Sequence, residues 1–485
     1  MERLHIVSIE NVYAILRQGF PADRDRPALV IPDVRTHSWR ELENLTGRLA
    51  NALGQRGLAP GDRVAVQADK SFEATALYLA CLKAGLVYLP LNTAYTKAEI
   101  AYFLEDAAPG LFVDNETLRA LVAAPAAAEG PIHPSGPDDL AALCYTSGTT
   151  GRAKGAMLTH RNLASNAQTL HRIWGFRPGD VLLHALPIFH VHGLFVALHT
   201  ALLNGSTMLF LPKFDAKQVL ELLPQASVMM GVPTFYTRLL DEPGLTTERC
   251  RHMRLFISGS APLLAETHGQ FEERTGQAIL ERYGMTETGM LASNPLQGPR
   301  RAGTVGLPLP DVELRIADEA GQPLPQGEVG LVEVRGPNIF PGYWRQPEQR
   351  AKDFRADGFF ITGDLGRIEP DGYLALVGRA KDLIITGGYN VYPKEIELVL
   401  DTIDGIGESA VVGLPHRDFG EGVTAFCTVE GATPTESEVL AQCRRELAAY
   451  KMPKRVLFVD ALPRNAMGKV QKAKLRERHN GLYGA

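Results

Sequence analysis

Residues 145–155 read YTSGTTGRAKG, so three glycines, four small hydroxyl residues and a lysine fall within one short stretch. Glycine lets a backbone approach a ligand closely and adopt positive φ. Hydroxyl donors together with Arg152 and Lys154 suit a polyphosphate, whereas the alternative is a polar surface loop that binds nothing. The stretch is not a Walker A loop, because Gly148 and Gly151 are too close together and glycine follows Lys154.

The segments on both sides of this loop alternate between strand and helix patterns. Upstream, residues 63–67, 71–84 and 87–91 read as a β–α–β unit, and an amphipathic segment at 156–170 follows the loop. Repeated β-then-α segments predict an open, mostly parallel sheet with helices on its faces. The expected strands downstream are residues 181–186, 207–211, 227–231, 253–258 and 278–281, with helices at 193–203, 217–223, 234–240 and 263–275.

The carboxyl ends of such strands are where ligands bind in open α/β sheets. This rule places His190, residues 259–261 and residues 283–287 near one crevice. After about residue 308, short strands between Gly/Pro turns predict a β subdomain.

The fold class is therefore α/β, with a large N-terminal domain of mostly parallel βα sheets plus a β subdomain. From Lys381 onward the pattern predicts a small α+β domain, in which Pro393 begins a helix. The expected domains are residues 1–380 and 381–485.

Composition narrows the class of protein. The chain has 485 residues, 45% of them hydrophobic, and a formal net charge of −5, which argues against nucleic acid or an anionic membrane as a partner. Its five cysteines show no CxxC spacing and are expected to be reduced thiols. The N-terminus lacks the pattern of a signal peptide, so a cytoplasmic location is expected.

Seven motifs follow one another in a fixed order. They are YTSGTTGRAKG (145–155), LPIFHVHG (186–193), SGSAP (258–262), ERYGMTET (281–288), FFITGDLG (359–366), GRAKDLIITGGYNVYP (378–393) and PRNAMGKVQK (463–472). The ordered set resembles the acyl-adenylate-forming superfamily of acyl-CoA synthetases, luciferases and peptide-synthetase adenylation domains. The resemblance implies ATP, Mg²⁺ and coenzyme A as the molecules that the chain uses.

Residue roles follow from the resemblance by matching position. The phosphate grip would use Thr146, Ser147, Gly148, Thr149, Thr150, Gly151 and Lys154. The adenine and its surroundings would be held by Gly259, Ser260, Ala261, Tyr283, Gly284, Met285 and Thr286. The resemblance also implies that Glu287 holds Mg²⁺, that Asp364 binds the ribose, and that Arg379 reaches the ribose or phosphate region. It implies a hinge at Lys381, which makes the small C-terminal domain mobile, and a pantetheine tunnel beside Gly387 and Gly388. Lys469 is the implied catalytic lysine. His190 would line the acyl or phosphate pocket.

Each of these residues also has a structural alternative. Asp364 after Thr-Gly could be a turn aspartate, and Glu287 could favour the first turn of a helix. Tyr283 could be a core residue, and Lys469 could be one charge in a solvated run. His190 and His192 lack a cysteine or carboxylate cluster, so a metal site there is not expected.

The acid pocket is expected around Val191, Ser258 and neighbouring loops, where the sequence is most similar to malonyl-CoA synthetases. A dicarboxylate brings a second negative charge that needs a buried cation, for which arginine is well suited. Arg254 and Arg301 match the positions that bind this carboxylate in those enzymes. Arg254 could instead face solvent, and Arg300 could replace Arg301.

The predicted reaction is ATP + malonate + CoA → malonyl-CoA + AMP + PPi through malonyl-AMP. The alternatives are a ligase for another short acid, such as oxalate, methylmalonate or a monocarboxylate, an adenylating enzyme that loads a carrier protein, and a non-catalytic nucleotide sensor. The chain ends soon after PRNAMGKVQK, which favours free CoA over a carrier protein. A monomer or weak homodimer is expected.

Overall fold

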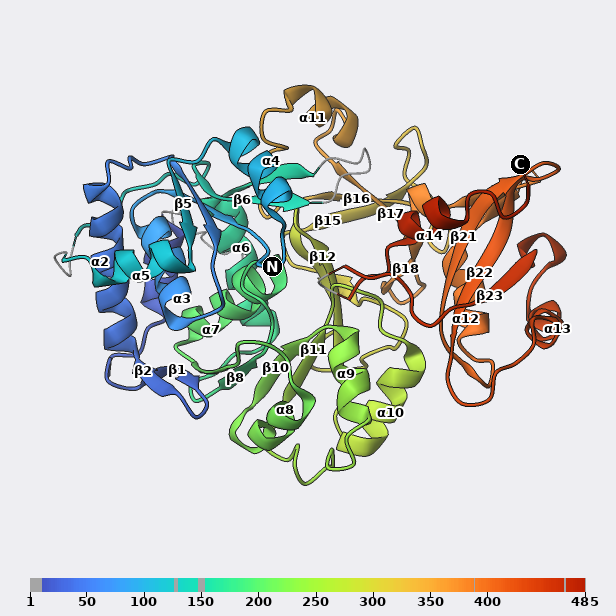
Figure 1. Cartoon of the computed structure of the whole chain (residues 1–485), viewed down its shortest axis with the longest axis horizontal. Helices are drawn as coiled ribbons and strands as arrows, with labels where there is room; N and C mark the ends of the chain where they lie inside the picture. The colour runs from blue at the N-terminus through green and yellow to red at the C-terminus, as the bar shows by residue number, and fades with distance from the viewer. Residues whose placement is uncertain (1–10, 126–129, 147–152, 388, 466–467, 485) are drawn as a thin grey trace. The chain divides into compact units, whose positions relative to one another are not determined.

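The structure is a computed structural model that describes residues 11–125, 130–146, 153–387, 389–465 and 468–484 (Figure 1). The chain divides into two compact units. Unit 1 comprises Met1–Glu313 and Val334–Phe360, and unit 2 comprises Leu314–Glu333 and Ile361–Ala485. The domain boundary predicted at Lys381 lies inside unit 2 and stays a prediction.

The larger sheet of unit 1 is the open, mostly parallel sheet that the alternating pattern predicts. Its strands, from one edge to the other, are β14 (Leu307–Pro308), β13 (Gly289–Ser293), β12 (Leu280–Met285), β11 (Leu255–Ser258), β10 (Val228–Gly231), β8 (Val181–His184), β9 (Thr207–Phe210), β1 (Pro27–Ile31) and β2 (Arg35–Ser38). The six strands from β12 to β1 are parallel to their neighbours, and the edge strands are antiparallel.

One face of this sheet is covered by three helices that follow its strands (Figure 1). They are α8 (Ala216–Leu222), α9 (Pro233–Leu240) and α10 (Ala265–Thr275). Tyr236 of α9, Phe256 of β11 and Phe271 of α10 are fully buried and pack edge to face, with ring centroids 4.9–6.4 Å apart. Burial of such apolar side chains holds the sheet and its carboxyl-end loops together.

The second sheet of unit 1 carries the segments that flank the glycine-rich stretch. Its strands are β5 (Leu111–Asp114), β3 (Arg63–Gln67), β4 (Val87–Pro90), β6 (Leu140–Thr146) and β7 (Lys154–Thr159), in that order across the sheet. The helices of this N-terminal region are α1 (Val12–Gln18), α2 (Trp39–Gln55), α3 (Phe72–Lys83), α4 (Lys97–Ala107) and α5 (Asn115–Ala123). β6 and β7 are antiparallel and pair Thr146 with Lys154, so the two ends of the stretch lie side by side.

Two segments differ from the expected secondary structure. Residues 156–170 are not one amphipathic segment, because β7 continues to Thr159, whose side chain caps α6 (His160–Ile173) by accepting from the Asn162 N–H. The helix expected at 193–203 begins as a π-helix, His192–Leu198, and continues as α7 (His199–Asn204). π-Helical turns often lie at functional sites.

Unit 2 holds most of a four-stranded sheet and a complete five-stranded sheet. The first contains β15 (Glu313–Ala317), β16 (Gly330–Arg335), β17 (Phe360–Ile368) and β18 (Leu374–Arg379). The second contains β19 (Ile384–Thr386), β20 (Tyr389–Val391), β21 (Ile406–His416), β22 (Gly420–Val429) and β23 (Arg455–Phe458), accompanied by α12 (Pro393–Leu400), α13 (Glu436–Glu446) and α14 (Lys472–His479). Apolar clusters cover both faces of the β21–β22 pair, as the α+β expectation requires.

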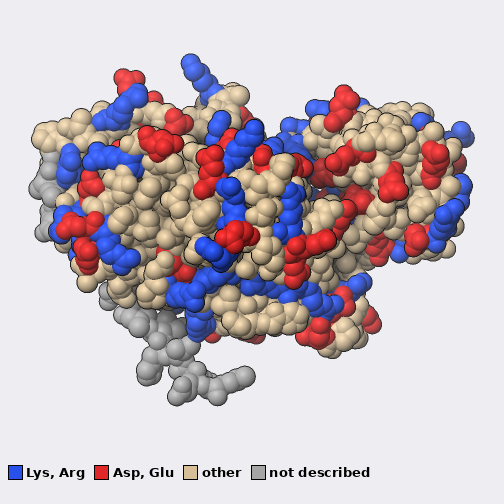
Figure 2. Space-filling model, turned by 90° about the horizontal axis from the view of Figure 1, so that it is seen from below, with Lys and Arg blue, Asp and Glu red and all other residues tan. Residues whose placement is uncertain are grey.

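The surface carries charges of both signs. On the face drawn in Figure 2, Lys and Arg side chains are interspersed with Asp and Glu, in keeping with the net charge of −5. Within the described residues, no helix has the length and apolar composition to cross a membrane.

Candidate functional site

The predicted crevice residues follow parallel strands that end side by side in unit 1. Register pairs Gly231 of β10 with Ser258 of β11, and Ser258 with Glu281 of β12. The loop after Ser258 therefore begins next to the chain that continues from Glu281 into Tyr283. This confirms that the motifs SGSAP and ERYGMTET meet at the carboxyl end of the sheet.

Ser260 lies at the centre of this meeting point. Its φ of 73° is in the left-handed region, which a residue with a Cβ adopts only at a cost. The Ser260 Oγ lies 3.2 Å from Nδ1 of His192, so this backbone geometry is combined with a side-chain contact to the LPIFHVHG motif. The His192 N–H lies 3.3 Å from Nδ1 of His190, which joins the two histidines of that motif.

Arg282 is the site residue that the sequence reading missed. Its side chain is 3% exposed, and its Nε and Nη2 have no hydrogen-bond partner among the described residues. A Cβ added to Gly259 would lie 2.5 Å from the Arg282 Cζ, so the guanidinium occupies the space that glycine leaves. The available signal was the charged pair Glu281-Arg282 directly before Tyr283, within a short strand.

Two further polar atoms on the segments that follow or end the parallel strands have no hydrogen-bond partner among the described residues. They are Nε2 of His192, which lies close enough to Arg282 for the charge of that residue to act on it, and Oγ of Ser258 at the end of β11. Burial lowers the pKa of His192, and the charge of Arg282 lowers it further, so the imidazole is neutral. Burial also lowers the pKa of Arg282, to about 9, which leaves the guanidinium charged at neutral pH. Unpaired buried polar groups are rare, and a cation among them suits an anionic ligand.

Glu287 is buried and held by two hydroxyl groups. Its Oε1 lies 3.2 Å from Oγ1 of Thr146 and accepts a hydrogen bond of 2.8 Å from the Tyr343 hydroxyl. The Lys154 Nζ lies 5.1 Å from the centroid of the Tyr343 ring, so one tyrosine touches both the carboxylate and the lysine. An oriented carboxylate oxygen beside a hydroxyl fits Mg²⁺, which prefers oxygen ligands.

The predicted phosphate residues are only partly within the described chain. Thr146 and Lys154 lie at the paired ends of β6 and β7, whereas Ser147, Gly148, Thr149, Thr150 and Gly151 lie outside the described residues. Thr146 therefore meets Glu287, a residue far away in sequence, at one edge of the crevice.

The remaining adenine residues lie on β12 and the turn after it. Tyr283 is 7% exposed and pairs with Ala292, so it is also the core residue that the alternative predicts. A Cβ at Gly284 would lie 2.2 Å from the Gly289 carbonyl oxygen, which explains the glycine there. Met285 and Thr286 continue into the turn that leads to Glu287, and Ala261 follows Ser260.

Unit 2 brings together the other three predicted nucleotide and catalytic residues. Asp364 and Arg379 are cross-strand partners on β17 and β18, with Arg379 Nε 2.7 Å from Asp364 Oδ1. Lys469 keeps solvent access, yet partial loss of water lowers its pKa. The charge of Arg379 lowers it further, and Asp364 opposes this effect. The three side chains therefore form one electrostatic group.

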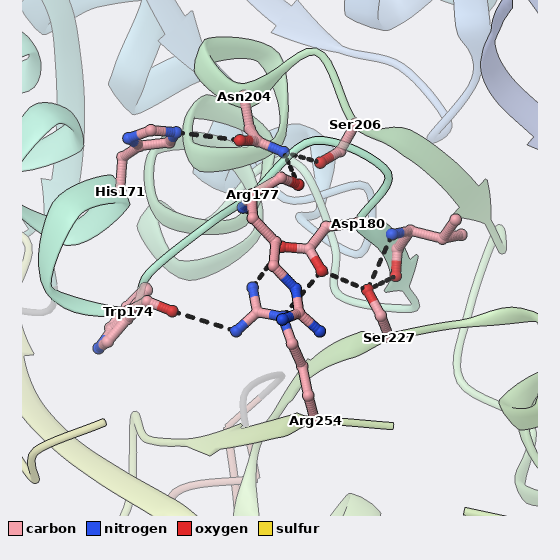
Figure 3. Close-up of polar contacts among 9 residues, drawn as sticks. His171, Trp174, Arg177, Asp180, Asn204, Ser206, Ser227 and Arg254 are labelled. Atoms are coloured by element: carbon pink, nitrogen blue, oxygen red, sulfur yellow. Dashed lines mark hydrogen bonds and ion pairs between the residues drawn. The ribbon is translucent and has the colours of Figure 1, made fainter. Parts of the chain in front are cut away.

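Arg254 lies away from the carboxyl ends of the strands. It precedes β11, at the opposite end of that strand from Ser258. Figure 3 shows its guanidinium against Asp180, with Nε 2.8 Å from Oδ1 and a second hydrogen bond from Nη2 to Oδ2. Asp180 is 3% exposed and also accepts from Ser227, so Arg254 balances a buried charge. Its predicted role in binding the acid stays a prediction.

Arg301 and Val191 remain near the crevice. The Arg301 N–H donates to Oδ1 of Asn294, and the Asn294 side chain donates to the carbonyl of Glu281, next to Arg282. Arg300 instead donates to the Ala278 carbonyl before β12. Val191 lines a cavity with Leu163, Asn166, Phe195 and Thr286.

The predicted CoA segment adjoins an exposed aromatic group in unit 2. The Gly387 N–H donates to the Phe419 carbonyl at 2.8 Å, Lys381 is exposed, and Gly388 lies outside the described residues. Tyr389 and Tyr450 stack with centroids 4.8 Å apart and are 58% and 37% exposed, respectively. Solvated aromatic rings beside lysines suit a nucleotide base and its phosphates.

Comparisons with known proteins cover almost the whole chain. Residues 17–344 match the AMP-binding enzyme family, and residues 395–469 match the AMP-binding enzyme C-terminal domain. The crystal structure of ATP-bound MatB from Rhodopseudomonas palustris is 52% identical, covers 98% of this chain and 100% of that chain, and has a TM-score of 0.95. A malonate–CoA ligase of Arabidopsis thaliana is 35% identical over 87% of this chain and 78% of its own length. A feruloyl-CoA synthase of an Amycolatopsis species is 36% identical over 91% and 94%, respectively.

Proposed function

This chain belongs to the AMP-binding enzyme family and is an AMP-forming CoA ligase, and on that premise we propose that its acid substrate is malonate. The observation that carries the proposal is the buried Arg282, whose Nε and Nη2 point at no acceptor in the described chain. The similarity to a malonate–CoA ligase supports the same substrate, and the 52% identity with ATP-bound MatB supports ATP as the nucleotide.

The physical argument concerns the carboxylate that does not react. Malonate carries two charges, and the second one must be paired when it leaves water. A guanidinium can bind a carboxylate through two parallel N–H groups, and Arg282 offers two unpaired nitrogens. His192, whose pKa the charge of Arg282 lowers, supplies a further unpaired polar atom near the guanidinium. A monocarboxylate would leave this cation buried and unpaired.

In the first half-reaction, the other carboxylate attacks the α-phosphorus of ATP and pyrophosphate leaves. Such displacements depend mainly on positioning and on neutralising charge. Thr146 and Lys154 are proposed to hold the β- and γ-phosphates, and Glu287 would hold Mg²⁺. Bound there, Mg²⁺ neutralises charge on the phosphates. We propose that Lys469 bridges the carboxylate and the α-phosphate as a compact cation.

In the second half-reaction, the CoA thiol attacks the acyl carbon of malonyl-AMP and AMP leaves. Asp364 is proposed to accept hydrogen bonds from the ribose of AMP, and Arg379 would orient it through their cross-strand pair. The CoA nucleotide is proposed to bind at Tyr450 and Phe419, where the Lys454 Nζ lies 4.2 Å from the centroid of the Phe419 ring. Lysine beside an aromatic ring supplies charge for phosphates and a surface for the base.

The alternative substrates differ in whether they need the buried charge of Arg282. Oxalate and methylmalonate also need a cation, and one methyl group is worth only ~1–3 kcal/mol of discrimination. A monocarboxylate does not need the cation, and the feruloyl-CoA synthase shows that such sequence similarity also extends to a bulky aromatic acid. Loading of a carrier protein would use the same adenylation site but not free CoA.

A panel of acids assayed for AMP release tests the proposal. Malonate, methylmalonate, oxalate, sulfoacetate, acetate and ferulate are supplied with ATP and Mg²⁺, with and without CoA. Malonate is expected to give the highest kcat/KM, and malonyl-CoA is expected to form. If acetate or ferulate is used faster than malonate, the dicarboxylate proposal is wrong. AMP release that free CoA does not accelerate would favour a carrier protein.

A further inference from the structure

Lys70 is a half-buried lysine in unit 1 that has no carboxylate partner among the described residues. It lies between β3 and α3, and burial lowers its pKa well below the usual range. Its Nζ lies 2.9 Å from Nδ1 of His184, 2.8 Å from the His184 carbonyl oxygen and 4.2 Å from the centroid of the Phe210 ring. In the described part of the chain it forms no ion pair, and neighbouring Asp69 is engaged with Asn115. Removing a lysine from water without a countercharge costs free energy, so a functional role for Lys70 is worth testing.

The partner of Lys70 is a histidine in a defined tautomer. His184 ends β8 and is 1% exposed. Its Nε2 lies 2.9 Å from the carbonyl oxygen of Gly193, which can only accept, so Nε2 carries the proton. Nδ1 is therefore an acceptor, and Lys70 donates to it. The result is a directed chain of hydrogen bonds from Lys70 through His184 to Gly193.

Gly193 lies in the π-helix that begins at His192, in the same motif as His190. A Cβ at Gly193 would lie 2.1 Å from the Pro187 carbonyl oxygen, so the start of this helix packs closely against the preceding chain. The Leu194 N–H donates to the His190 carbonyl at 2.9 Å, and the π-helix begins at His192. A shift of the Gly193 carbonyl would therefore move His192 relative to Ser260, its neighbour at 3.2 Å.

We propose that Lys70 is a specificity-determining positioning residue for the second carboxylate of the acid. Through His184 it holds the Gly193 carbonyl, and this sets where Nε2 of His192 stands beside the Arg282 guanidinium. The proposal rests on the proposed function, because it assigns the distal carboxylate to Arg282 and His192. In this proposal, Lys70 itself contacts neither malonate nor ATP.

The experiment compares Lys70→Met with Lys83→Met, a control from the end of α3. Lys83 is buried, at 8% exposed, and its Nζ lies 5.9 Å from the centroid of the Tyr13 ring. Pyrophosphate exchange is measured with malonate and with its monoamide, which lacks the second charge. Lys70→Met is expected to raise the KM for malonate about tenfold, the effect of a lost hydrogen bond to a charged group. In Lys70→Met, the KM for ATP and the KM for the monoamide should change less than about twofold. In Lys83→Met, the KM for malonate, for the monoamide and for ATP should all change less than about twofold.

A second pair of variants separates positioning from a general loss of packing. His184→Gln keeps an amide oxygen for Lys70 and an N–H for Gly193, and it should retain most malonate use. His184→Leu keeps neither and should reproduce Lys70→Met. Equal loss for malonate and the monoamide, equal effects of Lys70→Met and Lys83→Met, or equal impairment of the two His184 variants would each overturn the proposal. If the wild type prefers another acid, the proposed function fails, and Lys70 is judged by the KM of that acid instead.

Discussion

Replacement of Arg282 by methionine should weaken the use of malonate and raise the stability of the free enzyme. The guanidinium is 3% exposed and has two nitrogens without partners in the described chain, so in the free enzyme its buried charge is offset only in part, by the charge of Glu281. Methionine has a similar length, keeps the packing against Gly259 and removes the charge. The variant should therefore have a lower kcat/KM for malonate and a higher free energy of unfolding.

The magnitudes follow from the cost of a buried charge. Removing one partner of a buried, hydrogen-bonded charge pair typically costs about 2–5 kcal/mol, which corresponds to roughly 30- to 5,000-fold in kcat/KM for malonate. Burial lowers the pKa of Arg282 to about 9, because removing the charged guanidinium from water in the free enzyme costs free energy. Apolar replacement of buried charged groups is often stabilising, by about 1–4 kcal/mol. The free energy of unfolding is expected to rise by that order.

The assays are pyrophosphate exchange with malonate at saturating ATP, and urea unfolding without ligands. Arg254→Met and Arg301→Met are the matched comparisons. Arg254→Met should lower the free energy of unfolding by about 3–5 kcal/mol, because it leaves the buried Asp180 carboxylate uncompensated. An Arg282→Met enzyme whose kcat/KM for malonate stays within threefold of wild type would refute the assignment. Selective loss of malonate in Arg254→Met or Arg301→Met would transfer the role to that arginine.

Three further predictions concern other parts of the chain. Lys469→Ala should abolish pyrophosphate exchange but leave thioester formation from supplied malonyl-AMP, and loss of both half-reactions would contradict the role proposed for the lysine. Tyr343→Phe keeps the ring and removes the hydroxyl that donates to Glu287, so about tenfold more Mg²⁺ should be needed to bind a non-hydrolysable ATP analogue, as measured by calorimetry. Burial raises the pKa of Asp401 to about 6, against the opposing effect of Ser409, so the folded state holds the proton more tightly and loses stability as pH rises from about 4 to 6. Asp401→Asn should therefore stabilise the protein against urea by about 1–3 kcal/mol at pH 7.5 and leave it nearly unchanged at pH 4.

The strand and helix order of unit 1 was largely predictable from local pattern. The strand at residues 63–67 was predicted to the residue, and the alternation from residue 181 to 281 is the observed series of parallel strands and helices. Periodicity identified these segments because buried parallel strands are short apolar runs. The β7 strand was missed because its pairing with β6 depends on a partner beyond the glycine-rich loop.

The ordered motifs by themselves determined the family and, with it, ATP, Mg²⁺ and CoA as the molecules the enzyme uses. Short motifs carry this information because a phosphate loop or a TGD turn is made by neighbouring residues. The family comparisons agree with that reading over residues 17–344 and 395–469.

Which arginine is buried without a hydrogen-bonded carboxylate is decided only by the tertiary structure. Arg254 directly precedes β11 and Arg282 lies within β12 of the same sheet, and their local sequence does not report which of them meets a countercharge. Arg254 is neutralised by Asp180, a residue 74 positions away, whereas Arg282 is enclosed over Gly259 because β11 and β12 pair in one register. Charge compensation depends on which groups meet in space, and sequence distance does not report that.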